Sequence, residues 1–240
     1  MFGLNRDDRP GFCLVETGLE SFEMTSRQEL PNRSAKLDIS VAIILLAAGR
    51  SSRMSSDAGH KLLSIFNGVP LVRRMALRAI ESKASRVHAI TGFRHEKIEA
   101  CLAGLDMSIA FNPAFASGMA SSLIAGLKIP GVMDQDGLLI LLADMPCITT
   151  HNLNQLIEAF AASKGRSIVR AGFDGTSGNP VILPKSLYPQ ALTSRGDRGA
   201  KNLIETCDLD IIELDIGEAA IADVDTESDL QRLGGVPSAR

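Results

Sequence analysis

The chain has 240 residues, of which 45% are hydrophobic and 22% are charged, with a formal net charge of −3. This length fits one α/β domain or two small ones, and the apolar content supports a sizeable core. The slightly acidic balance excludes a general nucleic-acid binder, and no apolar stretch approaches the roughly 20 residues that cross a bilayer, so we expect neither nucleic acid nor membrane as a partner.

The first segment of the chain, residues 1–38, is polar and turn-rich. Its acidic residues and the lack of an apolar core exclude a secretory signal; the acidic residues are Asp7, Asp8, Glu16, Glu20 and Glu23. We therefore expect residues 1–38 to be a poorly ordered extension, or a start assigned too early with Met24 as the alternative. The functional domain is then residues 39–240.

From residue 40 onward, short apolar runs alternate with stretches of helical spacing. Strands are expected at residues 41–47, 86–92, 107–112 and 137–146. Helices are expected at residues 71–83, 95–104, 119–128 and 150–165, the last capped by Thr150. The run 41–47 is apolar throughout, which is typical of a strand covered on both faces.

The second half of the chain continues this alternation with one interruption. Residues 166–173 and 179–184 read as two strands that could pair as an antiparallel excursion. A helix over 197–207, a strand over 209–215 and a short helix with Thr226 and Asp229 in capping-box spacing follow. Alternating strands and helices predict a Rossmann-like three-layer α/β/α fold around a mainly parallel sheet.

The loop after the first strand carries small and basic residues, in the stretch "GRSSRMSSDAGHK". Gly49 favours close approach of the backbone to an anion, and Arg53 and Lys61 could add positive charge for a triphosphate. The pattern is neither a Walker loop nor a G-x-G-x-x-G fingerprint. From the spacing alone, a basic surface loop is the equal alternative.

Asp144 ends the most hydrophobic strand, at the edge where parallel sheets bind ligands. A carboxylate there could hold Mg²⁺, which takes one or two carboxylates together with substrate phosphates. Asp223 and Asp225 alternate in "DVDT", so either could supply the second ligand. The alternatives are a turn aspartate before Pro146 and an acidic approach to the last helix.

Several motifs, in order, resemble one family. "LLAAGRSSRMSSDAGHKLL" with "NGVPL" is similar to the signature L-A-[AG]-G-x-S-x-R-M-G…K…G-x-P-L of MobA-like nucleotidyltransferases. "ADMP" and "DVDTESDL" resemble the family's metal-binding and closing motifs. "NPAFASGMASSLIAGL", "SGNPVILP" and "RGDRGAKNLI" resemble the branch of molybdenum cofactor cytidylyltransferases. The resemblance covers residues 41–233 and implies a fold of the nucleotide-diphospho-sugar transferase type.

The resemblance also implies a role for each matching residue. For the nucleotide it implies Leu46, Ala47, Ala48, Gly49, Arg53, Lys61, Asn112, Gly118, Ser121 and Ser122. For catalysis it implies Arg53, Lys61 and Asp144, and for Mg²⁺ it implies Asp144 and Asp225. For the second substrate it implies Gly178, Asn179, Pro180, Asp197 and Gly199.

The activity that the resemblance implies is transfer of CMP from CTP to the phosphate of the molybdenum–pterin cofactor. "LAAG" in place of "LAGG" goes with cytidine nucleotides in this family. Two positions depart from its pattern: Ser55 replaces a glycine, and Asn179 replaces a histidine and cannot ionise near neutral pH. The alternatives are transfer to a sugar or polyol phosphate, and a non-catalytic chaperone that holds the cofactor for a molybdenum hydroxylase.

Cysteine usage gives the expected location. Four cysteines lie far apart and form no C-x-x-C pair; they are Cys13, Cys101, Cys147 and Cys207. This pattern favours reduced thiols in a cytoplasmic protein. The expected partners are then CTP, the molybdenum–pterin cofactor and, transiently, a molybdenum hydroxylase.

Overall fold

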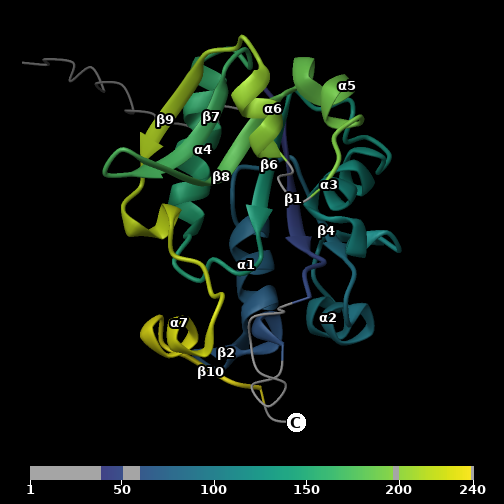
Figure 1. Ribbon diagram of the computed structural model, residues 1–240, viewed down its shortest axis with the longest axis vertical. Helices are drawn as coiled ribbons and strands as arrows, with labels where there is room; N and C mark the ends of the chain where they lie inside the picture. Colours follow the sequence, from purple (N-terminus) through teal and green to yellow (C-terminus); the bar gives the residue numbers. More distant parts are fainter. Residues whose placement is uncertain (1–38, 51–59, 197–199, 239–240) are drawn as a thin grey trace, which may run out of the picture. The chain divides into compact units, whose positions relative to one another are not determined.

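The computed structural model describes residues 39–50, 60–196 and 200–238 (Figure 1). The expectation for residues 1–38 lies outside the described residues, as do Arg53, Ser55, Asp197 and Gly199. Within the described part of the chain, no helix combines the length and the apolar character needed to span a bilayer.

A seven-stranded sheet in the order β5-β4-β1-β6-β8-β7-β9 forms the centre. Its strands are β1 (Val41–Ala47), β4 (Arg86–Thr91), β5 (Ser108–Phe111), β6 (Gly137–Leu142), β7 (Ile168–Phe173), β8 (Thr176–Pro184) and β9 (Ile211–Asp215). Every neighbouring pair is parallel except those that involve β8, which is antiparallel to β6 and β7. The expected mainly parallel sheet and its antiparallel excursion are therefore confirmed.

The central strand β1 has no polar face. Ile43 and Leu45 belong to the core on one side of the sheet, whereas Ala42 and Ile44 belong to the core on the other. Because successive side chains of a strand point to opposite faces, a strand between two helical layers must be apolar at every position. This explains the unbroken apolar run.

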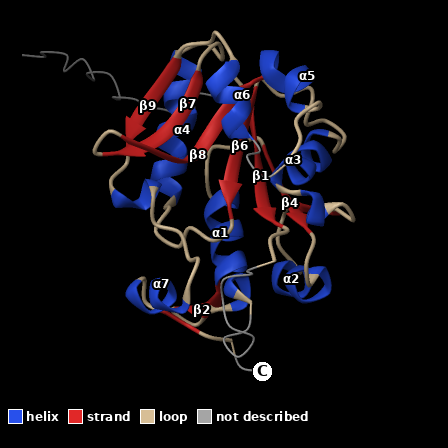
Figure 2. Cartoon of the chain, viewed as in Figure 1, coloured by secondary structure: helices blue, strands red, loops and turns tan. Residues whose placement is uncertain are grey.

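Helices cover both faces of the sheet, which gives the three expected layers (Figure 2). One core includes side chains of α1 (Leu71–Ile80), α2 (His95–Leu102) and α4 (Thr150–Ala162). The other includes side chains of α3 (Met119–Leu127), α5 (Tyr188–Ala191) and α6 (Ala200–Thr206). The remaining helical segments are α7 (Glu227–Arg232) and the 3₁₀ turns η1 (Lys61–Leu63), η2 (Phe115–Ser117), η3 (Lys185–Leu187) and η4 (Glu218–Ala220).

Two helix starts test the expected caps. The capping box of α7 is confirmed, with Thr226 and Asp229 each bonding the other's backbone N–H. For α4 the prediction is wrong by one residue, because Thr149 is the cap and pairs with Asn152. Thr150 is instead the first helical residue, and its hydroxyl donates to Arg78 O.

A second, three-stranded sheet was not predicted. It joins β10 (Gly235–Val236) to the hairpin of β2 (Ile65–Phe66) and β3 (Val69–Pro70). Asn67 and Gly68 both have positive φ, as the two-residue turn of a tight hairpin requires. This sheet ties the segment after Lys61 to the end of the chain.

The side chain of His60 links the residue segments on either side of 51–59 through contacts with Gly49 and Leu62. Its side chain is 1% exposed, Nε2 lies 3.0 Å from Gly49 O, and Nδ1 accepts from Leu62 N at 3.3 Å. The neutral tautomer with a proton on Nε2 satisfies both contacts. Burial lowers the pKa of His60 from 6.5 to about 4, so the ring is neutral at pH 7.

We expect the protein to lose stability as the pH falls from about 6.5 to about 4. The unfolded chain binds a proton at His60 in this window and the folded chain does not, so the free energy of unfolding drops by up to about 3 kcal/mol. Urea unfolding at several pH values measures it. His60→Gln should flatten this slope, while His151→Gln, at an exposed histidine, should not. An identical slope in His60→Gln and the parent protein would contradict the assignment.

Candidate active site

Five segments meet around one cavity of about 490 Å³ at the carboxyl end of β1 and β6. They are the turn after β1, the start of η1, the segment from η2 into α3, the residue that follows β6 by two positions, and the segment between η4 and α7. The charged residues among them that line the cavity are Arg50, Lys61, Asp144, Asp223 and Asp225. The structure thus brings the two described ends of the expected loop together with the expected carboxylates.

Lys61 lies between two carboxylates. Its Nζ is 2.6 Å from Asp144 Oδ2 and 3.0 Å from Asp225 Oδ1, and its side chain is 11% exposed. Burial acts to lower the pKa of Lys61, but the two aspartates outweigh burial and raise it above its ordinary value. The side chain is therefore a fixed ammonium group at neutral pH.

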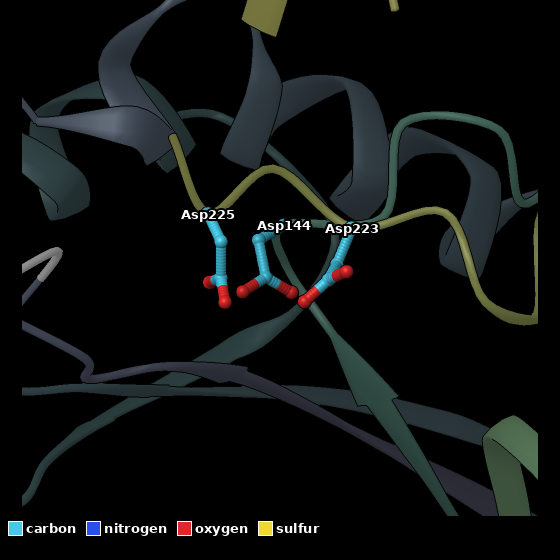
Figure 3. A group of neighbouring side chains, drawn as sticks. All are labelled: Asp144, Asp223 and Asp225. Atoms are coloured by element: carbon cyan, nitrogen blue, oxygen red, sulfur yellow. The ribbon is translucent and has the colours of Figure 1, made fainter. Parts of the chain in front are cut away.

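Residues 223–225, the sequence "DVD", alternate between a buried side chain and side chains that face the cavity. Val224 is fully buried, and its N–H donates to Asp144 O at 2.9 Å, so the backbone of this segment is attached to the end of β6. The carboxylates of Asp223 and Asp225 lie on the other side, with Asp144 between them (Figure 3). One ligand oxygen from each of the three aspartates lies within 4.8 Å of the others.

Three carboxylates crowd together around the ammonium of Lys61. Burial, Asp144 and Asp225 together raise the pKa of Asp223, as expected when like charges are crowded. Asp144 Oδ2 accepts from Lys61, whereas Oδ1 is buried and has no hydrogen-bond partner. A hard divalent cation with oxygen ligands fits this donor set, and Asp144 with Asp223 or Asp225 would hold it.

The side of the cavity formed by the end of β1 and the start of α3 is lined by small and apolar residues. Of the expected residues, Leu46, Ala48, Gly49, Gly118 and Ser122 line it. A Cβ placed on Gly49 would meet no atom within 4 Å, and Gly49 does not have a positive φ. The glycine therefore leaves open space toward the cavity, and it is not required by an unusual backbone conformation.

Three of the residues expected to bind the nucleotide, Ala47, Asn112 and Ser121, do not line this cavity. Ala47 is fully buried in the core, because strand alternation turns it away from the face of Leu46 and Ala48. Asn112 is 3% exposed and does not line the cavity. Its amide donates to the hydroxyls of Ser121 and Ser122. Asn112 therefore supports the start of α3 through hydrogen bonds and does not itself face the cavity.

Residues that the sequence analysis missed complete this wall. Phe115 and Met119 line the cavity, and the guanidinium of Arg50 lies 5.4 Å from the centre of the Phe115 ring. Gly92 makes the packing possible, since a Cβ there would lie 2.7 Å from the Phe115 Cβ and 2.8 Å from the Ala48 Cβ. Gly92, directly after β4, was the feature of the sequence that could have indicated this close packing.

A second cavity, of about 470 Å³, adjoins the first and shares Leu46, Met119 and Leu142 with it. Gly178 and Asn179, expected to face the acceptor, line it. Pro180, the third residue expected to face the acceptor, is buried and does not line this cavity. Gly178 also has a structural role, because a Cβ there would lie 2.1 Å from Ala220 O, in the segment that leads to Asp223.

Taken together, the first cavity combines an ammonium group, three carboxylates suited to a divalent cation, and an open glycine turn. These features suit a nucleoside triphosphate bound with a metal ion. The second cavity can hold a further substrate at the same sheet edge. This arrangement supports group transfer between two bound molecules.

Comparison with known proteins agrees with this arrangement. The family model for the MobA-like NTP transferase domain matches residues 43–211. The bifunctional protein GlmU of Francisella philomiragia is 30% identical over 146 residues, which are 60% of this chain and 31% of that protein. The chain thus spans about a third of the length of the GlmU proteins that it matches.

The purine catabolism protein PucB of Bacillus subtilis is 26% identical over 204 residues, which are 79% of this chain and 94% of that protein. Among solved structures, Rv0371c of Mycobacterium tuberculosis has a TM-score of 0.69 at 21% identity, and covers 81% of this chain and 97% of that one. A manganese complex of Rv0371c has a TM-score of 0.67 at 18% identity, and covers 81% of this chain and 98% of that one. These structures share the fold.

The family match spans the turn after β1, Lys61 and the aspartate after β6, and it ends before Asp223 and Asp225. It also extends over well more than half of the chain. The chain therefore belongs to the MobA-like NTP transferase family and is a nucleotidyltransferase of that type.

Proposed function

We propose that this protein transfers CMP from CTP to the phosphate of the molybdenum–pterin cofactor, with Mg²⁺ as cofactor and pyrophosphate as the second product. The observation that carries the proposal is the meeting of Lys61 with Asp144 and Asp225 beside the open turn at Gly49. The choice of cytidine rests on "LAAG" at residues 46–49, and the choice of acceptor rests on the motifs of the cytidylyltransferase branch.

The reaction needs little covalent work from the protein. An oxygen of the acceptor phosphate attacks the α-phosphorus of CTP, and the bond from that phosphorus to the β-phosphate's bridging oxygen breaks. Pyrophosphate leaves with the bonding electron pair. Because a phosphate monoester is already ionised at neutral pH, no general base is required. This agrees with a site that presents neither a histidine base nor a cysteine nucleophile among the described residues lining it.

Charge stabilisation and positioning are the tasks left to the chain. The ammonium of Lys61 offsets the charge that develops on the leaving pyrophosphate, and the aspartates hold that ammonium in place. A bound divalent cation would add Lewis-acid stabilisation of the triphosphate. Arg53, which lies outside the described residues, remains a predicted ligand of the triphosphate.

Two other activities fit the family, and the acceptor separates them from our proposal. Transfer to a sugar or polyol phosphate would use the same nucleotide site. A chaperone for a molybdenum hydroxylase would bind the cofactor without turnover. Pyrophosphate release from CTP with the purified cofactor, compared with sugar phosphates, decides among the three.

Asp144→Asn should lower kcat by about 100-fold or more, because it removes a carboxylate that would hold the cation. The fold should survive, since Asn has nearly the same shape, and a thermal melt checks this. Asp174→Asn is the matched control, because Asp174 is exposed in a turn with positive φ, which Asn tolerates. Near-normal pyrophosphate release from Asp144→Asn would remove the metal assignment.

Lys61→Met should lower kcat/KM for CTP by about 100-fold, because it removes the cation that faces the phosphates. Initial rates at varied CTP measure this effect. Lys83→Met, at an exposed lysine that pairs with Glu158, should leave the rate unchanged. An equal rate in Lys61→Met and the parent protein would show that the triphosphate lies elsewhere.

Asp223→Asn and Asp225→Asn should change different kinetic quantities. Asp225 pairs with Lys61, so its loss should raise both the KM for CTP and the Mn²⁺ concentration needed for half-maximal rate. Loss of Asp223, which crowds Asp144 without pairing with Lys61, should raise mainly the metal requirement, by about 10-fold. Metal titrations at saturating CTP give the comparison. If Asp223→Asn keeps the parent's metal requirement, Asp225 is the second ligand.

A further inference from the structure

The two adjoining cavities differ in charge. The charged residues of the first cavity comprise three aspartates against Arg50 and Lys61. Among the described residues that line the second cavity, the charged ones are Arg170 and Lys201, and both are positive. A cavity whose described lining has cationic side chains and no carboxylate attracts an anion or a strong hydrogen-bond acceptor.

Arg170, on β7, has more donors than partners. Its Nη2 donates to Ser177 Oγ, and Glu213 Oε2 lies 4.0 Å from the same nitrogen. Its Nε is buried and has no hydrogen-bond partner. A 4.0 Å pair with a 41% exposed glutamate contributes little, so the guanidinium charge is only weakly compensated.

The rest of the second cavity is mostly apolar. Three strands and two helices supply the aliphatic side chains of its lining, among them Leu46, Ile140, Leu142, Val181, Leu123 and Ile204. A sugar or polyol could reach Ser177 and Asn179 with some of its hydroxyl groups, but the hydroxyl groups that face the aliphatic side chains would lose their hydrogen bonds to water. A flat apolar or heteroaromatic body would instead bury its surface there.

Arg170 lines the second cavity, whereas the three aspartates line the first. Asp144 follows β6, Arg170 lies on β7, and β8 runs between those two strands. Two strand spacings separate their backbones by about 10 Å. Arg170 lines the second cavity and not the first, and the three aspartates line the first and not the second, so we treat an anion on Arg170 as a different group from one reacting beside Asp144.

From these observations we infer that Arg170 determines acceptor specificity by binding a second anionic or carbonyl group, remote from the reacting phosphate, on a heteroaromatic body that fills the second cavity. This inference rests on the proposed function for the place of the reacting phosphate. It sets the acceptor class apart from small sugar and polyol phosphates. It gives a role to Arg170, which lies in none of the motifs quoted from the sequence.

Fluorescence titration with pterin-6-carboxylate, a heterocycle with an anionic group, tests the contact directly. Pterin, which lacks the carboxylate, is the matched ligand. Arg170→Gln should weaken binding of pterin-6-carboxylate by about 10- to 100-fold and change binding of pterin much less, because only the carboxylate meets the guanidinium. Arg170→Lys should lose less than Arg170→Gln, since it keeps the charge.

Arg166→Gln is the control variant, because Arg166 is exposed and outside both cavities. It should bind both pterins as the parent protein does. Ribose 5-phosphate, a phosphate on a polyhydroxy body, should displace neither pterin. Equal binding of pterin-6-carboxylate by Arg170→Gln and the parent protein would overturn the inference, as would efficient displacement by ribose 5-phosphate.

Calorimetric titration of the same variants with CTP and Mg²⁺ separates this inference from the proposed function. Binding of CTP should be unchanged in Arg170→Gln, which also shows that the variant is folded. If the parent protein does not bind CTP, the proposed function fails, whereas the pterin titrations still decide the role of Arg170. If CTP binds and the pterin titrations show no loss in Arg170→Gln, the inference alone fails.

Discussion

The ammonium of Lys61 between two carboxylates is the interaction on which the site depends. Lys61 lies directly between two of three aspartates whose ligand oxygens are within 4.8 Å of one another, so its loss would leave Asp144 and Asp225 without this shared ammonium. An uncompensated buried charge costs about 3–5 kcal/mol in proteins. Lys61 therefore holds the carboxylates close enough to share a cation, and the carboxylates hold Lys61 charged and oriented toward the cavity.

Backbone contacts bring these side chains together from distant parts of the chain. Val224 N–H bonds to Asp144 O, which fixes the aspartates before α7 beside the end of β6. Gly178 allows the backbone at Ala220 to approach β8 closely enough for that register. The small sheet of β2, β3 and β10 fastens the segment after Lys61 to the segment after α7. Positioning thus comes from main-chain geometry, while the chemistry comes from a few side chains.

The core of the fold could be predicted because its signals are local. Apolar runs with no polar face indicated buried parallel strands, and helical spacing between them indicated the covering layers. The short elements were harder to predict. The hairpin at Asn67 and Gly68 carries a turn signal, but its third strand, β10, lies far away in the sequence. The cap of α4 shifted by one residue because two adjacent threonines offer the same hydroxyl group.

The sequence by itself determined the residue types of the site and their order: a glycine turn, a lysine, an aspartate after an apolar strand, and an alternating acidic pair. Tertiary structure decided which of these residues meet. It placed the side chain of Ala47 in the core, used the Asn112 side chain to hold a turn, and set Arg170, which no motif marked, in the lining of the second cavity. The physical reason is that side-chain direction in a strand is local, whereas charge pairing and cavity walls depend on strands that are neighbours only in the folded sheet.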